Sequence, residues 1–125
     1  RQRQMCIRDR PKDHGKGRQI EGRFSENDKI VLIDDLITTG GSVLNAVKAT
    51  EKDGGHVAGV SSIFTYYLPD AKENFKKANV KYAPLLSYPE LLKKENESGH
   101  ITSEQYDILK TWHEDPWAWG KKFNN

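Results

Sequence analysis

Hydrophobic and polar positions alternate along this chain in blocks that have the lengths of strands and helices. Ile30 to Ile33 are four consecutive apolar residues, three of them β-branched, which predicts a strand buried on both faces. The stretches Val57 to Tyr67 and Val80 to Leu86 predict two further strands. Between the strands, Val43 to Lys52 and Pro69 to Ala78 have apolar residues at helical spacing. The alternation of strands and helices predicts a parallel α/β sheet with right-handed βαβ crossovers.

Two capping boxes predict helices in the last third of the chain. Ser87 is followed three residues later by Glu90, and Thr102 is followed by Gln105. We expect the first helix to reach about Asn96 and to place Leu91 and Leu92 on its inner side.

The second of these helices has an aromatic stripe. Tyr106, Leu109 and Trp112 recur at helical spacing, which is typical of a core or subunit contact. We place His113 on the polar side of this helix and assign it no chemistry. The aromatic and basic end, Trp117 to Phe123, is a candidate to dock on the sheet edge or on a partner chain.

The first 23 residues contain no apolar periodicity. Residues 1–10 are interpreted as a foreign or disordered lead, and residues 11–125 as the domain proper. Within the domain, residues 11–23 are polar and punctuated by glycine, which predicts a mobile loop.

Composition narrows the class of protein. At 125 residues with 35% hydrophobic content, the chain is one domain or a piece of one. Its mean hydropathy is −0.83, and it has neither a long apolar run nor an apolar segment behind a basic start, so we expect no membrane span and no secretory signal. A single cysteine, Cys6, agrees with a reducing compartment and predicts a cytoplasmic location.

Charge is distributed unevenly although the net charge is only +2. Residues 1–23 contain eight Arg or Lys against three Asp or Glu, so the remainder of the chain is net negative. A basic segment can bind nucleic acid, but no aromatic residue precedes Phe24 to stack on bases. We therefore expect a small polyphosphate as the anionic ligand, and neither nucleic acid nor membrane as a partner.

The candidate chemistry follows the first strand. Asp34 and Asp35 come at its C-terminal end, and the small residues Thr38 to Ser42 connect them to the next helix. Glycines allow close approach of a ligand, and the first N–H groups of a helix lack intrahelical partners, so a phosphate fits this loop. The two carboxylates then suit ribose hydroxyls or Mg²⁺. An ordinary strand-to-helix turn with two solvated acids is the alternative.

The stretch from Ile30 to Ser42, IVLIDDLITTGGS, resembles the phosphoribosyl-diphosphate (PRPP) motif of the type I phosphoribosyltransferases. It lacks the lysine of a Walker loop and the GxGxxG of a dinucleotide site. Upstream, Lys12-Asp13-His14-Gly15 is similar to the core of the catalytic loop in the orotate phosphoribosyltransferase family. The resemblance covers about residues 11–125 and corresponds to the C-terminal portion of such an enzyme.

The resemblance implies a partial doubly wound parallel sheet of phosphoribosyltransferase type with C-terminal helices. It also implies transfer of ribose 5-phosphate from PRPP to orotate, which gives orotidine 5′-phosphate and diphosphate in pyrimidine biosynthesis. The implied cofactor is Mg²⁺, held through PRPP and water near Asp34 and Asp35. The intact enzyme would be a homodimer, because the mobile loop of relatives reaches into the neighbouring site.

The resemblance also implies residue roles. Lys12, His14, Asp34 and Asp35 are the candidate catalytic residues, and Thr38 would also contact orotate. The candidate PRPP-binding residues are Arg8, Lys12, His14, Asp34, Asp35, Leu36, Ile37, Thr38, Thr39, Gly40, Gly41 and Ser42.

Two departures from the family pattern are visible. Asp9 stands where relatives have the second residue of a basic pair, and Tyr66 stands where many have an orotate-contacting arginine. We favour a packing role for Tyr66. The alternatives to an enzyme are a PRPP- or nucleotide-binding regulator of the same fold without catalysis, and an inactive fragment.

Overall fold

In the computed structural model of the chain, residues 6–7, 20–21 and 24–123 are described. Two short antiparallel strands, β1 (Cys6–Ile7) and β2 (Ile20–Glu21), pair at Cys6 with Glu21 and Ile7 with Ile20. The candidate residues Arg8, Lys12 and His14 lie outside the described residues. The division of the chain at residues 10 and 11 stays a prediction.

The main sheet has three parallel strands in the order β3-β4-β5. They are β3 (Lys29–Ile37), β4 (His56–Thr65) and β5 (Tyr82–Ser87). Helix α1 (Gly41–Lys52) connects the first pair, and α2 (Pro69–Lys77) connects the second. The predicted α/β class and the parallel sheet are confirmed.

The strand β3 is longer than the sequence predicted. It contains the acid pair and continues to Ile37, because Leu36 pairs with Phe64 and Ile37 with Thr65. β4 conversely ends at Thr65, and Tyr67 beyond it has a positive φ of 52°. The predicted strand limits at Ile33 and Tyr67 were therefore wrong.

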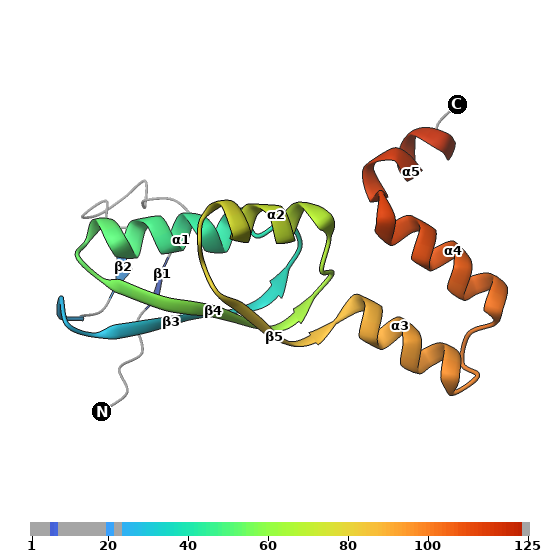
Figure 1. Cartoon of the computed structure of the whole chain (residues 1–125), viewed down its shortest axis with the longest axis horizontal. Helices are drawn as coiled ribbons and strands as arrows, with labels where there is room; N and C mark the ends of the chain where they lie inside the picture. Colours follow the sequence, from blue (N-terminus) through green and yellow to red (C-terminus); the bar gives the residue numbers. More distant parts are fainter. Residues whose placement is uncertain (1–5, 8–19, 22–23, 124–125) are drawn as a thin grey trace.

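The hydrophobic core lies between the sheet and the helices α1 and α2, which cover the same face of the sheet (Figure 1). The core is formed by side chains from β3, β4 and both helices, namely Ile30, Leu32, Ile37, Val43, Val47, Val60 and Phe75. Phe75 points inward, is 4% exposed and stacks on Tyr82, with ring centroids 4.3 Å apart. Burying an aromatic ring of this size stabilises the fold by roughly 1.5–3 kcal/mol.

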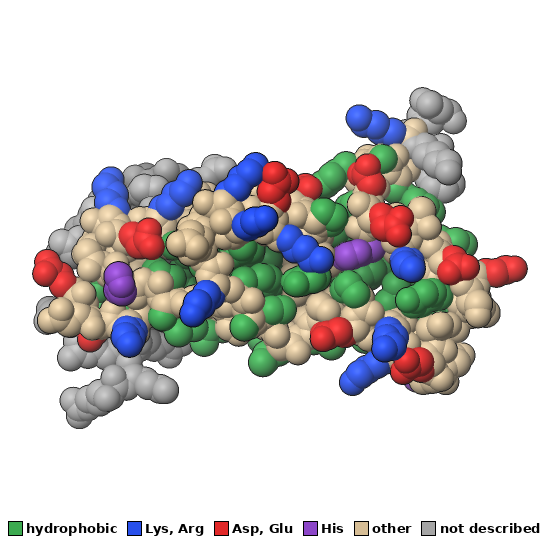
Figure 2. All heavy atoms as spheres, in the orientation of Figure 1, with side chains coloured by type: hydrophobic (Ala, Val, Ile, Leu, Met, Phe, Trp, Pro, Cys, Tyr) green, Lys and Arg blue, Asp and Glu red, His purple; other side chains and the backbone are tan. Residues whose placement is uncertain are grey.

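The opposite face of the sheet is not covered by any described helix. Ile33 is 78% exposed and Leu85 is 77% exposed, and Val31 and Ile63 are also exposed. Hydrophobic side chains accordingly reach the surface along the lower side of the sheet in Figure 2. The prediction that the first strand is buried on both faces was therefore wrong for this chain, since only one helical layer is present among the described residues.

Three helices follow β5 and lie beyond the end of the sheet at which β5 stops (Figure 1). They are α3 (Tyr88–Glu97), α4 (Ser103–Glu114) and α5 (Pro116–Phe123). Both predicted capping boxes are formed, one at Ser87 and one at Thr102. Leu92 is buried as predicted, but Leu91 is 38% exposed, so that part of the prediction was wrong.

The aromatic end of the chain forms α5, which contacts the first turn of α2. The indole Nε1 of Trp117 donates a hydrogen bond of 2.9 Å to the carboxylate of Asp70, in the first turn of α2. Among the described residues, no helix combines the length and the apolar character that crossing a membrane requires.

Candidate functional site

The end of β3 is held firmly by its neighbour β4. The carbonyl oxygen of Ile37 accepts hydrogen bonds from the N–H of Tyr66 at 3.1 Å and from the hydroxyl of Thr65 at 3.2 Å. Ile37 is 2% exposed and Thr65 is fully buried. The point at which the chain leaves the sheet is therefore fixed, and so is the start of the loop from Thr38 to Gly40.

That loop leads directly into the N-terminus of α1. Gly40 adopts a left-handed conformation with φ of 82°, and its carbonyl accepts the N–H of Leu44 at 2.9 Å. Gly40, the N-cap residue, has no side chain that could cap this terminus, and no acidic residue lies in its first turn. Gly41 and Ser42 are exposed, so the positive end of the helix dipole faces solvent and can receive an anion.

The acid pair lies on the same strand, only a few residues before this helix terminus. The N–H of Asp35 donates to Asp34 Oδ1 at 2.8 Å, and the N–H of Leu36 donates to Asp35 Oδ1 at 2.8 Å. Asp34 is half-buried, whereas Asp35 is exposed. The two carboxyls therefore have different environments although they are adjacent in the sequence.

These environments move the two pKa values in opposite directions. Burial, and then the hydrogen bond shared with the Asp35 carboxyl, raises the pKa of Asp34 above its ordinary value of 3.8. The same shared hydrogen bond, followed by the Leu36 N–H, lowers the pKa of Asp35. Of the pair, Asp34 thus holds a proton more readily and Asp35 is the more persistent anion.

The oxygen ligands of this pair fit a hydrated Mg²⁺ ion, which commonly keeps several waters and takes one or two carboxylates together with phosphate oxygens. Within the described ranges, no group of three or more His, Cys, Asp or Glu residues is arranged to hold a metal directly. Asp34 and Asp35 are therefore the residues on this edge that could hold Mg²⁺ through water and a ligand.

Tyr66 belongs to an aromatic cluster at the end of β4. Its ring meets Phe64 edge-on at 5.5 Å, Tyr88 at 6.0 Å and Trp112 at 6.0 Å between centroids. These contacts support the packing role that we favoured for Tyr66. They also attach α3 and α4 to the sheet.

His113 lies on the packed side of α4. It is half-buried, its Nε2 lies 2.6 Å from the carbonyl oxygen of Tyr66, and its ring stacks on Tyr88 with centroids 5.4 Å apart. The packed face of α4 therefore includes His113 as well as Tyr106, Leu109 and Trp112. The prediction that His113 lies on the polar side of this helix was wrong.

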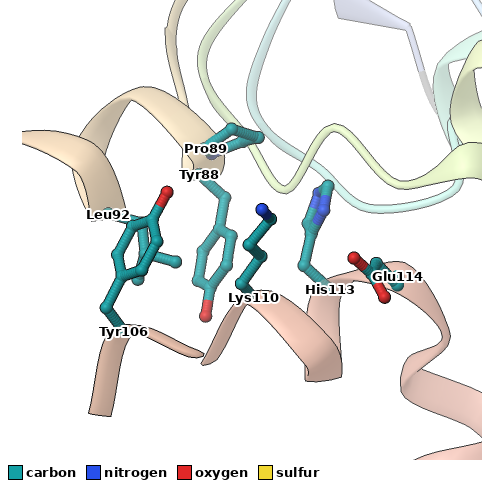
Figure 3. A pocket seen from close by; sticks show the side chains of 7 residues that line it. All are labelled: Tyr88, Pro89, Leu92, Tyr106, Lys110, His113 and Glu114. Carbon is teal, nitrogen blue, oxygen red and sulfur yellow. The ribbon is translucent and has the colours of Figure 1, made fainter. Parts of the chain in front are cut away.

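A hollow lies between α3 and α4, next to this cluster (Figure 3). Its walls are formed by Tyr88, Pro89, Leu92, Tyr106, Lys110, His113 and Glu114, around about 430 Å³ of empty space that includes the open mouth. Neither aspartate of the acid pair lines it. The hollow belongs to the helical extension and is separate from the loop that follows β3.

Comparison with known proteins identifies relatives along nearly the whole chain. No family model matches the sequence. The orotate phosphoribosyltransferase of Lactobacillus johnsonii is 92% identical over 121 residues, which cover 97% of this chain and 57% of the relative. This chain thus spans little more than half the length of that relative.

Solved structures agree with this relationship. The Leishmania donovani UMP synthase structure has a TM-score of 0.65 and 25% identity, and the match covers 86% of this chain and 23% of that one. The Mycobacterium tuberculosis orotate phosphoribosyltransferase in complex with PRPP has a TM-score of 0.51 and 30% identity over 59% of this chain and 44% of that one. The fold is therefore that of the phosphoribosyltransferases.

Proposed function

We propose that this chain, the C-terminal portion of a member of the orotate phosphoribosyltransferase family, supplies the PRPP-binding part of an enzyme that transfers ribose 5-phosphate to orotate. The observation that carries the proposal is the exposed N-terminus of α1 behind the left-handed Gly40, with Asp34 and Asp35 on the strand that leads to it. A phosphorylated sugar needs both features, since its phosphate takes backbone N–H groups and its hydroxyls take carboxylates.

In the proposed reaction the bond from C1′ of the ribose to the diphosphate oxygen breaks, and a bond from C1′ to a ring nitrogen of orotate forms. That nitrogen loses its proton to water, and diphosphate is the leaving group. Thr38 to Ser42 hold the 5′-phosphate, and Asp34 and Asp35 hold the ribose hydroxyls. Asp34 and Asp35 would hold Mg²⁺ through water and PRPP, and the ion would supply positive charge to the departing diphosphate. Holding the sugar in place converts binding energy into a lower barrier.

The remaining roles rest on the family resemblance. Lys12 and His14 stabilise negative charge on the leaving diphosphate, Arg8 contributes to PRPP binding, and Thr38 contacts orotate. The complete protein is a homodimer that works in the cytoplasm, as the reach of the catalytic loop in relatives and the single cysteine suggest.

We further propose that the 125-residue chain alone does not catalyse the reaction, and the exposed face of the sheet supports this. Ile33, Ile63 and Leu85 are apolar and exposed, and the Lactobacillus johnsonii relative has further sequence outside the region that this chain matches. We therefore expect catalysis only when the N-terminal portion of that relative precedes this chain in a hybrid protein.

The test compares the hybrid protein with the 125-residue chain. Orotidine 5′-phosphate formation should appear in the hybrid and be absent in the chain, and Asp35→Asn in the hybrid should reduce kcat by a factor of about 100 with little change in melting temperature. Lys76→Ala, an exposed change on α2, is the matched control. A folded hybrid that neither binds PRPP nor forms product would overturn the proposal.

A further inference from the structure

Helix α2 contacts the candidate phosphate loop directly. The side-chain amide Nδ2 of Asn74 donates a hydrogen bond of 3.0 Å to the carbonyl oxygen of Thr39, across 35 positions of sequence. The next residue, Phe75, is 4% exposed and lies against Gly40, where an added Cβ would come within 2.7 Å of its ring. Two consecutive residues of α2 thus contact two consecutive residues of the loop.

The hydrogen bond from Asn74 determines the orientation of a peptide unit in the loop. The carbonyl of Thr39 and the N–H of Gly40 belong to one planar trans unit, in which they point in opposite directions. When Asn74 holds the carbonyl toward α2, the N–H of Gly40 is directed to the opposite side. Phe75 prevents the loop from collapsing toward the helix, because its ring is itself stacked on Tyr82.

We propose that Asn74 is a positioning residue for ligand binding, which acts by holding the Thr39 carbonyl so that the N–H groups at the start of α1 face the 5′-phosphate. The inference rests on the proposed function for the identity of the ligand, but the orientation of the loop can be tested without it. Asn74 takes no part in the chemical step, so its contribution should appear in PRPP binding.

The first arm of the test uses the ligand-free 125-residue chain. Asn74→Ala removes the donor while raising helix propensity, and Asn74→Asp keeps the shape but cannot donate. Both variants should shift the ¹H–¹⁵N amide signals of Gly40 and Gly41 and speed their hydrogen exchange, while signals from Ile30 to Ile33 stay unchanged. Lys76→Ala on the same helix should leave all of these signals in place.

The second arm measures steady-state kinetics in the hybrid protein. Asn74→Ala and Asn74→Asp should each raise the KM for PRPP roughly fivefold to tenfold, the effect of one hydrogen bond, with kcat within about twofold of the parent. If Asn74 contributed only to stability, its substitution would instead lower the melting temperature and leave the KM of the folded protein unchanged.

The outcomes separate the two proposals. Unchanged loop amides in both variants, or an unchanged KM, would overturn the positioning role of Asn74. An equal response to Lys76→Ala would overturn it as well. A parent hybrid without PRPP binding would count against the proposed function, and the amide signals of the first arm would still decide whether Asn74 orients the loop.

Discussion

At the scale of single residues, the loop after β3 contains two glycines with different roles. Gly40 is buried, has a left-handed backbone and faces the ring of Phe75. Gly41 begins α1, is exposed, and an added Cβ there would meet only the Thr39 hydroxyl at an ordinary 3.7 Å. Gly40 is thus required by the fold, whereas Gly41 lies at the exposed start of α1.

We expect Gly40→Ala to lower the free energy of unfolding by about 2–5 kcal/mol, because it combines a left-handed backbone with overpacking against Phe75. Gly41→Ala should change it by no more than about 0.5 kcal/mol. Urea unfolding of the two variants measures both values. Equal stabilities would contradict the assignment of Gly40 to the core.

The acid pair gives a prediction with a defined dependence on pH. Since burial raises the pKa of Asp34, the folded chain binds that proton more tightly than the unfolded chain. The contribution of Asp34 to stability is complete below its ordinary pKa of 3.8 and is lost as the pH rises through the raised folded value. Asp34→Asn should therefore become progressively more stable than the parent between about pH 3 and about pH 7.

The control for this prediction is Asp35→Asn. The pKa of Asp35 is lowered, so its contribution is present above 3.8 and is lost as the pH falls through the folded value. Because Asp35 is exposed and water screens its charge, its substitution should lower stability only slightly, and only above about pH 4. The urea midpoint of each variant, measured across the pH range and compared with that of the parent, tests both expectations. If both substitutions shifted the midpoint in the same direction, the opposite pKa shifts assigned to Asp34 and Asp35 would be wrong.

At the scale of elements, the junction between β5 and α3 depends on one capping box. The hydroxyl of Ser87 accepts a long hydrogen bond of 3.5 Å from the N–H of Glu90, and the Glu90 carboxylate accepts from the N–H of Ser87 at 3.0 Å. Ser87 is only 8% exposed, whereas Thr102, which caps α4 in the same way, is exposed. Because water can replace the hydroxyl only at the exposed cap, the two caps should differ in their contribution to stability.

We therefore expect Ser87→Ala to cost about 1–2 kcal/mol and Thr102→Ala at most about 1 kcal/mol. The urea midpoint measures the loss of stability in each variant, and amide hydrogen exchange in the first turns of α3 and α4 shows whether the loss arises at the substituted cap. Should Thr102→Ala prove the more costly change, the burial of the β5–α3 junction would not be the deciding factor.

At the scale of the whole molecule, one face of the sheet is packed and the other is bare. Ile33 and Leu85 are more than three-quarters exposed, whereas Leu32, which precedes Ile33 on β3, is 7% exposed on the helix-covered face. Exposed apolar patches on a sheet mark surfaces that another layer covers. The relative that is 92% identical contains more sequence than this chain, and we expect that N-terminal portion to provide the covering layer.

Substitutions on the exposed face of the sheet should therefore change stability little in the 125-residue chain and much more in the hybrid protein. In the 125-residue chain, Ile33→Ala and Leu85→Ala should each change the free energy of unfolding by less than about 0.5 kcal/mol. In the hybrid protein each should cost about 2–5 kcal/mol, since a covered methylene group is lost with a cavity. Leu32→Ala, the control, should be costly in both, and similar values for Ile33→Ala in the two proteins would show that the face stays uncovered.

The sequence by itself determined the features that depend on near neighbours. Apolar runs and helical spacing located the three strands and the helices α1 to α4, and the Ser87 and Thr102 boxes marked helix starts, because these signals arise within a few residues. The loop from Thr38 to Ser42 was recognisable for the same reason, since its glycines and the following helix adjoin it.

Only the tertiary structure decided the features that join distant segments. The extension of β3 to Ile37 follows from pairing with β4, and the burial of His113 follows from contact with Tyr66, 47 positions away. The hydrogen bond from Asn74 to Thr39 leaves no local pattern, because its two partners meet only when α2 packs on the sheet. The same packing decides which face of β3 is buried, since an apolar run is compatible with one covering layer or with two.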